Sequence, residues 1–226
     1  MKFARPTSRE TKPAPNLNNP SLSRGAFLCC TAISGLLLAG CATEAPAPGD
    51  ATAGGAVTTE QVAAFIPQDF EPPVSAEGDG FILKPLGPDV MQADYDAYMS
   101  SIEHLQKTFT RTDKWPREGL TIDDAAEDMA NEKRRFDARE SFAYAVLTVD
   151  GSRERGCVYV RPAGKPGYDA AVQLWVTKAE FDDGFDELLY SWTIEWIDSE
   201  WPFETVAYPG RNISWAEWEA LPDQAD

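Results

Sequence analysis

Residues that commonly act as nucleophiles or general bases are scarce in this chain. It contains one histidine, His104, and four cysteines among 226 residues. His104 lies between Ile102 and Leu105, off the apolar stripe of its segment, and no partner can be named for it, so we expect an exposed side chain rather than a general base. Cys157 lies in an apolar, strand-like run and is expected to be a small core residue. Because ligands of the Cys/His kind are so few, we predict no metal site.

A third chemically distinctive position, Cys41, follows an uncharged apolar run of 15 residues from Ala26 to Gly40. The first 40 residues carry five bases and one acid. The apolar run is shorter than the roughly 20 residues that span a bilayer, and with its basic flank it is typical of a secretory signal. The sequence Leu38-Ala39-Gly40-Cys41 resembles the lipobox of bacterial lipoproteins. That resemblance implies cleavage before Cys41 and lipidation of its thiol.

These features divide the chain into three parts. Residues 1–40 are predicted to be a signal peptide, residues 41–77 a flexible tether and pre-domain segment rich in Ala, Pro and Gly, and residues 78–226 a globular domain. Lipidated Cys41 would then hold the protein at a membrane of the bacterial cell envelope, facing the periplasm or the exterior. Only Cys41 and Cys157 would remain after cleavage, so no intrachain disulfide is expected.

The net charge is strongly negative. The chain has 20 Lys and Arg against 37 Asp and Glu, a formal net charge of −17. Nucleic-acid binding needs clustered basic residues that neutralise phosphates, so we exclude a nucleic-acid partner. Nine acids and no base lie between Ala179 and Gly210, where an anionic ligand would therefore be poorly accommodated.

The hydrophobic periodicity predicts a mixed α/β domain in the order β-α-α-β-β-β-α-β-α. A stripe from Met91 to Phe109 indicates one amphipathic helix, and helix caps are predicted at Thr121 and Ser214. The predicted strands are 81–86, 141–149, 157–161, 171–176 and 203–208, and a further helix is expected from Phe185 onward. Hairpin-linked central strands favour a mixed sheet with helices on both faces.

This order, and the central hairpin of residues 142–150 and 156–161, resemble the GNAT N-acetyltransferase fold over about residues 81–211. The resemblance implies that the backbone of Trp175 and Val176 contacts the pantetheine arm of acetyl-CoA. It also implies that Gly184 occupies the first glycine position of the pyrophosphate loop. Phe181 and Asp186 stand where the family has Arg or Gln and a second Gly or Ala, and the family's last two strands are expected to be missing.

Three functions remain open at this stage. The first is a lipid-anchored envelope protein with a degenerate, non-catalytic GNAT-like domain that binds a small ligand or an envelope partner, with no cofactor. The second is an N-acetyltransferase-like enzyme that transfers an acyl group from acetyl-CoA to an amine, using Trp175, Val176 and Gly184. The third is a structural surface lipoprotein. The acids of the loop favour the first function.

Overall fold

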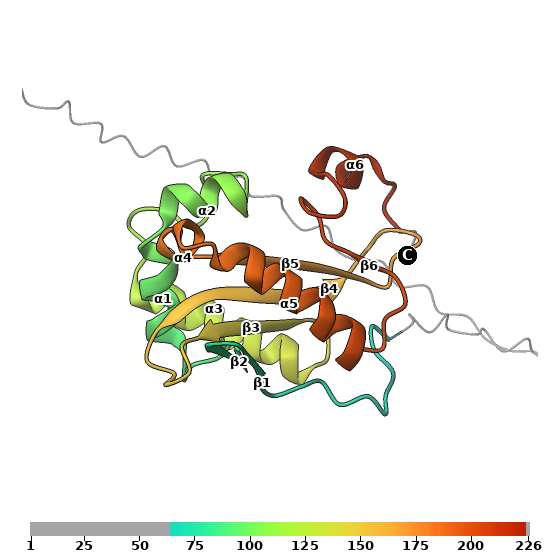
Figure 1. Ribbon diagram of the computed structural model, residues 1–226, viewed down its shortest axis with the longest axis horizontal. Coiled ribbons are helices and arrows are strands. Elements are labelled where there is room, and N and C mark those ends of the chain that lie inside the picture. The colour runs from blue at the N-terminus through green and yellow to red at the C-terminus, as the bar shows by residue number, and fades with distance from the viewer. Residues whose placement is uncertain (1–63, 225–226) are drawn as a thin grey trace, which may run out of the picture. The chain divides into compact units, whose positions relative to one another are not determined.

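The computed structural model describes residues 64–224, in which a six-stranded sheet lies between helices (Figure 1). Its strands follow the sheet in chain order: β1 (Ala76–Gly78), β2 (Phe81–Pro85), β3 (Phe142–Leu147), β4 (Glu154–Pro162), β5 (Ala170–Val176) and β6 (Val206–Ala207). Strands β1 to β5 pair antiparallel with their neighbours, whereas β6 is parallel to β5. The predicted mixed sheet is therefore confirmed.

Helices cover both faces of this sheet, as expected. The helices of the described residues are α1 (Met91–Met99), α2 (Ile102–Thr108), α3 (Ile122–Asp137), α4 (Lys178–Asp182), α5 (Phe185–Glu200) and α6 (Trp215–Ala220). In Figure 1, α5 crosses one face of the sheet, and α1 and α3 lie on the other. Among residues 64–224 no helix is long and apolar enough to cross a membrane.

Strict alternation along the central strands divides the core into two layers. Phe142, Tyr144 and Val146 of β3 pack on the layer that contains Leu189 and Ile197 of α5. Their neighbours Ala143, Ala145 and Leu147 pack on the layer of α1, α2 and α3. Successive side chains of a strand point to opposite faces, so strands covered on both sides are apolar throughout.

Local sequence signals fix where two helices begin. The Thr121 hydroxyl accepts a hydrogen bond from the Asp124 N–H, and the Asp124 carboxylate accepts one from the Thr121 N–H. Ser214 and Glu217 form the same reciprocal pair at the start of α6. Both predicted caps are confirmed. They could be predicted from the sequence because each depends only on two residues that are three positions apart.

The single helix predicted from Met91 to Phe109 is two helices. Ser101 has a φ of −138°, outside the helical range, and separates α1 from α2. Its hydroxyl accepts a hydrogen bond of 2.8 Å from the backbone N–H of Lys178, the first residue of α4. The break between α1 and α2 is thus stabilised by a residue far away in the sequence, which the hydrophobic stripe cannot reveal.

Strand β6 is much shorter than the predicted strand 203–208. The Asp169 carboxylate accepts hydrogen bonds from the N–H groups of Glu204 and Thr205. On the other side, the Asn212 side chain accepts one from the Tyr208 N–H. Side chains therefore satisfy backbone groups that a longer strand would pair with β5, and only two residues join the sheet.

The packed core begins upstream of the boundary predicted at Gly78. Ile66 is 2% exposed, and Phe65 and Phe70 pack against the same layer as α5. Strand β1 also falls within the segment that was predicted to be a tether. The predicted signal peptide, Cys41 and the first part of the tether lie outside the described residues.

A β-bulge interrupts the pairing of β3 with β4. Val146 pairs with Gly156 and Leu147 pairs with Glu154, which leaves Arg155 as an extra residue. Gly156 lies so close to β5 that a Cβ atom there would be 2.0 Å from the Trp175 carbonyl oxygen. The extra residue places Glu154 on the face of β4 that carries Cys157, although the two are an odd number of positions apart.

Candidate functional site

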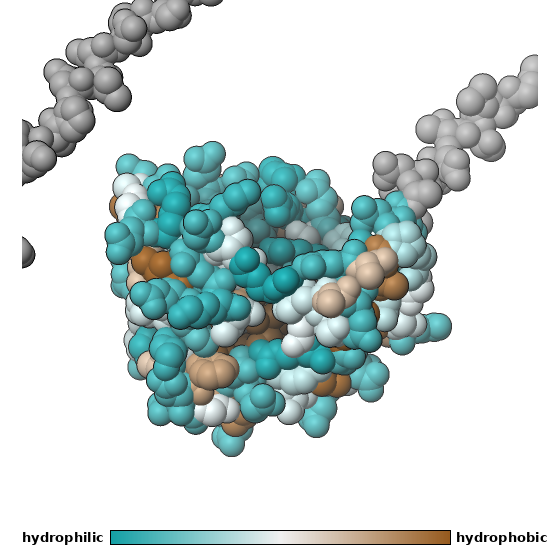
Figure 2. All heavy atoms as spheres, turned by 90° about the horizontal axis from the view of Figure 1, so that it is seen from above, coloured by the Kyte–Doolittle hydropathy of each residue, from teal (hydrophilic) through white to brown (hydrophobic). Residues whose placement is uncertain are grey.

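A cleft opens where the parallel strands β5 and β6 separate. Only Ala170 and Ala171 pair with β6, and the chain then leaves the sheet at Tyr208. The resulting cleft has a volume of about 220 Å³. Figure 2, seen from above the view of Figure 1, shows this face hollowed at its centre, with hydrophobic atoms deep in the hollow and hydrophilic atoms around it.

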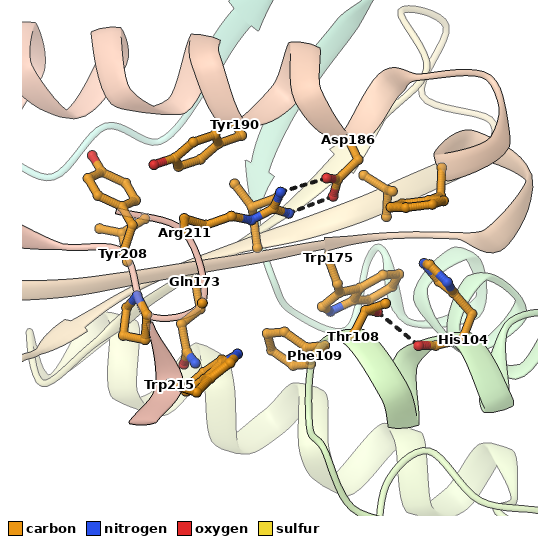
Figure 3. A pocket seen from close by; sticks show the side chains of 16 residues that line it. His104, Thr108, Phe109, Gln173, Trp175, Asp186, Tyr190, Tyr208, Arg211 and Trp215 are labelled. Atoms are coloured by element: carbon orange, nitrogen blue, oxygen red, sulfur yellow. Dashed lines mark hydrogen bonds and ion pairs between the residues drawn. The ribbon is translucent and has the colours of Figure 1, made fainter. Parts of the chain in front are cut away.

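Side chains from α2, β5, α5 and the segment after β6 line the cleft (Figure 3). Those labelled in the figure are His104, Thr108, Phe109, Gln173, Trp175, Asp186, Tyr190, Tyr208, Arg211 and Trp215. Aromatic rings therefore make up much of the wall. A few polar groups face the same space, which is the usual composition of a small-molecule site.

An ion pair crosses the cleft. Both Arg211 Nη atoms lie 2.7 Å from the Asp186 carboxylate oxygens, in a two-bond arrangement. The Asp186 side chain is 9% exposed and that of Arg211 is 27% exposed. Hydrogen bonding to Asp186 raises the pKa of Arg211 above its ordinary value. Figure 3 shows the guanidinium reaching from the segment after β6 toward the first turn of α5.

His104 lies at the end of the cleft formed by α2. It is partly buried, with its ring centroid 4.9 Å from that of Phe181. Burial, followed by the positive charge of Lys178, lowers the pKa of His104 below 6.5. The imidazole is therefore neutral at pH 7 and can accept a proton. The expectation of an exposed histidine away from any site is corrected, because the break before α2 turns this residue toward β5.

The structure places two of the three predicted cofactor-binding residues on the cleft. Trp175 and Val176 line it, and both side chains are buried. Gly184 is not among the lining residues; it is the N-cap of α5, with a φ of +81°. This left-handed conformation suits glycine, and it sets the direction in which α5 begins, two residues before Asp186.

Three of the acids before and within α5 have basic partners. Glu180 forms ion pairs with Arg153 and Arg155, and Asp182 forms one with Lys178. Burial raises the pKa of Glu180, but the two arginines outweigh it and the net shift is downward. Sequence counting between Ala179 and Gly210 missed these partners, because they come from β4 and from positions just outside that stretch.

A second group of chemically active side chains lies in the interior, behind the sheet. Asp94 of α1 and Glu154 and Cys157 of β4 are all buried, and their ligand atoms lie within 4.8 Å of one another. Burial raises the pKa of Asp94 to about 6, and burial together with the charge of Asp94 raises that of Glu154. Cys157 is a buried residue as predicted, but its neighbours are acidic.

Comparison with known proteins finds structural similarity only. No protein-family model and no curated protein matches the sequence. A ribosomal-protein-S5-alanine acetyltransferase from Vibrio fischeri superposes with a TM-score of 0.49 at 14% identity, over 66% of this chain and 81% of that one. A Vibrio cholerae structure described as a ribosomal-protein-serine acetyltransferase has a TM-score of 0.42 at 12% identity, over 55% and 67% of the two chains.

A spermidine N-acetyltransferase chimera from Vibrio cholerae gives a TM-score of 0.36 at 12% identity, over 52% of this chain and 62% of that one. These neighbours belong to the fold that the sequence resembles. All three TM-scores are below 0.5, so the function of this chain must be argued from its own cleft.

Proposed function

We propose that the protein is a lipid-anchored envelope binding protein whose cleft takes a small ligand without catalysis. The Asp186–Arg211 ion pair is the observation that carries this proposal. It lies across the space between β5 and the segment after β6 and joins the two sides by two hydrogen bonds of 2.7 Å. A ligand must fit beside this pair or break it.

The lining of the cleft favours an uncharged or cationic ligand with a flat apolar part. Phe109, Tyr190 and Trp215 offer aromatic surfaces, against which a flat ring can stack. The charges of Asp186 and Arg211 cancel, and the His104 imidazole is neutral at pH 7. The cleft volume of about 220 Å³ is smaller than the roughly 300–1,000 Å³ of sites for drug-sized ligands, so the ligand is smaller than a drug-sized molecule.

Acetyl-CoA fits this site poorly. Arg211, the base that could meet a phosphate in the cleft, is already bound to Asp186. The first turn of α5 carries two acids, Asp186 and Glu187. At an effective dielectric of 20, two like charges 4 Å apart repel by about 4 kcal/mol, more than the ~0.3–1 kcal/mol that a helix N-terminus gives an anion.

Calorimetric titration of the full chain with acetyl-CoA tests this exclusion. We expect no measurable binding by the wild type and a gain of affinity in Asp186→Ala, which frees Arg211 and removes an acid from the α5 turn. Glu195→Ala is the matched control, because it removes the same charge from an exposed position of α5 beyond its first turn. Micromolar binding by the wild type would overturn the proposal.

The ligand class is testable with three molecules of nearly equal shape. Saturation-transfer NMR on the full chain with benzamide, benzamidinium and benzoate compares a neutral, a cationic and an anionic ring. We expect the first two to receive saturation from the protein and benzoate to receive little. Gln173→Trp, which adds an indole to the lining, should abolish both signals; a preference for benzoate would contradict the proposed class.

Anchoring through Cys41 forms the second half of the proposal. The supporting observation is the apolar run that ends in Leu38-Ala39-Gly40-Cys41. Growth with a labelled fatty acid should label the wild type and leave Cys41→Ala unlabelled. Cys30→Ala is the control, because the residue before Cys30 is Cys29, whereas the lipobox-like Cys41 follows the small residues Ala39 and Gly40. Equal labelling of wild type and Cys41→Ala would end this part of the proposal.

Acyl transfer to an amine is the second candidate function, and the partly buried His104 favours it. A neutral imidazole on the cleft could take a proton from a substrate ammonium group, which leaves the neutral amine that attacks the thioester. Release of free CoA from acetyl-CoA in the presence of spermidine measures the reaction. Turnover that is lost in His104→Gln, and kept in the exposed-face variant Lys107→Gln, would favour this function over the binding protein.

A further inference from the structure

The interior cluster of Asp94, Glu154 and Cys157 lies apart from the cleft, on the α1 side of the sheet. All three side chains are at most 3% exposed. The Cys157 Sγ atom is 3.0 Å from Glu154 Oε1 and 3.5 Å from Asp94 Oδ1. One thiol and two carboxyl groups thus converge from a helix and a strand that are about 60 positions apart in the sequence.

The β4 bulge is what brings these groups together. Glu154 and Cys157 would face opposite sides of a regular strand, because they are three positions apart. The extra residue Arg155 rotates Glu154 onto the face of Cys157, and α1 then supplies Asp94 above both. β-Bulges commonly orient a side chain toward a functional site, so this bulge points to a chemical role for Glu154.

The carboxyl groups of the cluster contact each other and Cys157, but no base among the described residues neutralises them. Within residues 64–224, Glu154 Oε2 has no hydrogen-bond partner, although the residue is 1% exposed. No Lys, Arg or His of that part of the chain forms an ion pair with Asp94 or Glu154, and Asp128 and Glu132 add negative charge nearby. An unpaired polar group in the interior destabilises the fold, and an unpaired charge does so more strongly.

We propose that Asp94, Glu154 and Cys157 form a binding site for one Zn²⁺ ion. Zinc takes both thiolate and carboxylate ligands, at about 2.3 Å and 2.0–2.2 Å. A tetrahedron with those bond lengths has sulfur–oxygen edges of about 3.6 Å. The Asp94 separation of 3.5 Å matches this edge, and the Glu154 separation of 3.0 Å has to lengthen when the metal enters. The three side chains supply three donors, and water takes the fourth position, as in zinc sites with three protein ligands. The expectation of no metal site rested on the small number of Cys and His residues and on the lack of acids at known metal-binding spacings, and neither criterion detects groups that only the fold brings together.

Metal binding leaves the charge of the interior unchanged. Without metal at pH 7 the thiol holds its proton, and one of the two adjacent carboxyl groups holds another, so the three groups carry a charge of −1. Zn²⁺ binding forms the metal–sulfur and metal–oxygen bonds and releases those two protons to solvent. Three ionised ligands and a dication again sum to −1.

Cobalt substitution tests the site in the full chain. The chelator-treated protein is titrated with Co²⁺, both when folded and during refolding from urea. We expect one equivalent to produce a thiolate-to-cobalt charge-transfer band and intense tetrahedral d–d bands, both of which Zn²⁺ removes. Cys157→Ser should lose the charge-transfer band. Glu154→Gln should weaken Zn²⁺ binding by at least about 100-fold, since even outer-shell substitutions cost metal sites about 10–100-fold.

Two controls separate this site from other sources of metal binding. The triple variant Cys29→Ser, Cys30→Ser, Cys41→Ser should keep the charge-transfer band, because Cys157 remains. Circular dichroism of Cys157→Ser should match the wild type, so that a lost band reports ligand loss rather than unfolding. A band that persists in Cys157→Ser, disappears in the triple variant, or never forms under either condition would overturn the proposal. None of these results depends on what the cleft binds.

Discussion

Within the described part of the chain, acidic residues beside the cleft are paired with bases, whereas the acidic residues of the interior cluster behind the sheet are not. Glu180, Asp182 and Asp186 each form an ion pair with a base. Asp94 and Glu154 lie in the interior with no base paired to them among residues 64–224. The first set is already neutralised and resists further anions, whereas the second set lacks positive charge. The same residue types therefore disfavour an anionic ligand in one region and favour a metal cation in the other.

The ion pair of the cleft should give the largest effect when it is broken. Arg211→Met leaves Asp186 buried without a partner, which we expect to cost about 2–4 kcal/mol in the free energy of unfolding. Urea unfolding of the full chain measures the loss. The double variant Arg211→Met, Asp186→Leu should recover most of it, because it removes both charges. If the single and double variants were equally unstable, the pair would not be what holds α5 to the segment after β6.

The pH dependence of stability should have opposite signs in the two regions. The pKa of Asp94 rises from 3.8 to about 6 in the folded state. Between these values the folded protein binds more protons than the unfolded chain, so stability falls as pH rises through this window, by about 3 kcal/mol for this group. The pKa of Glu180 is lowered, so its contribution is complete above the unfolded value and is lost as the pH falls.

Urea unfolding at a series of pH values, in the presence of a chelator, separates these contributions. Asp94→Asn should flatten the decline between pH 4 and 6, and Glu180→Gln should flatten the decline on the acid side. The exposed Asp183→Asn is the control and should leave both slopes in place. An unchanged slope in Asp94→Asn would contradict the assignment of the decline to the interior.

Gly184 should give the smallest effect of the three. Its φ of +81° is unfavourable for any other residue, and nothing lies within 4 Å of an added Cβ atom. Gly184→Ala should therefore cost about 1 kcal/mol through backbone strain alone. Gly164→Ala, with a φ of +61° and equally open space, is a matched control far from α5. Only the Gly184 variant should also alter the fluorescence of Trp175 beside the cleft.

Local patterns predicted the elements of this fold, and long-range contacts decided the rest. The caps at Thr121 and Ser214 lie within a few residues of the helices they start, so the sequence alone could place them. The break at Ser101 depends on Lys178, and the short β6 depends on Asp169. Neither partner is visible in the periodicity of the segment it changes.

The candidate sites were less predictable than the elements. Trp175 and Val176 could be placed near the cleft through the resemblance to a known fold. The partnership of Asp186 with Arg211 joins positions 25 residues apart, and the interior cluster depends on one extra residue in β4. An alternating pattern cannot indicate a bulge, so the sequence does not show that Glu154 and Cys157 share one face of β4.

The two-residue pairing of β6 has a consequence for how the protein fluctuates. Strands β3, β4 and β5 are held by antiparallel ladders of six and seven residue pairs, whereas β6 joins β5 only at Val206 and Ala207. Opening this seam disrupts few ladder hydrogen bonds, so its free energy lies below that of global unfolding. Backbone amides of residues 205–211 should exchange with deuterated solvent long before those of β3 and β4. A ligand could thus enter the cleft when residues 205–211 separate from β5, while the pairing of β3, β4 and β5 stays intact.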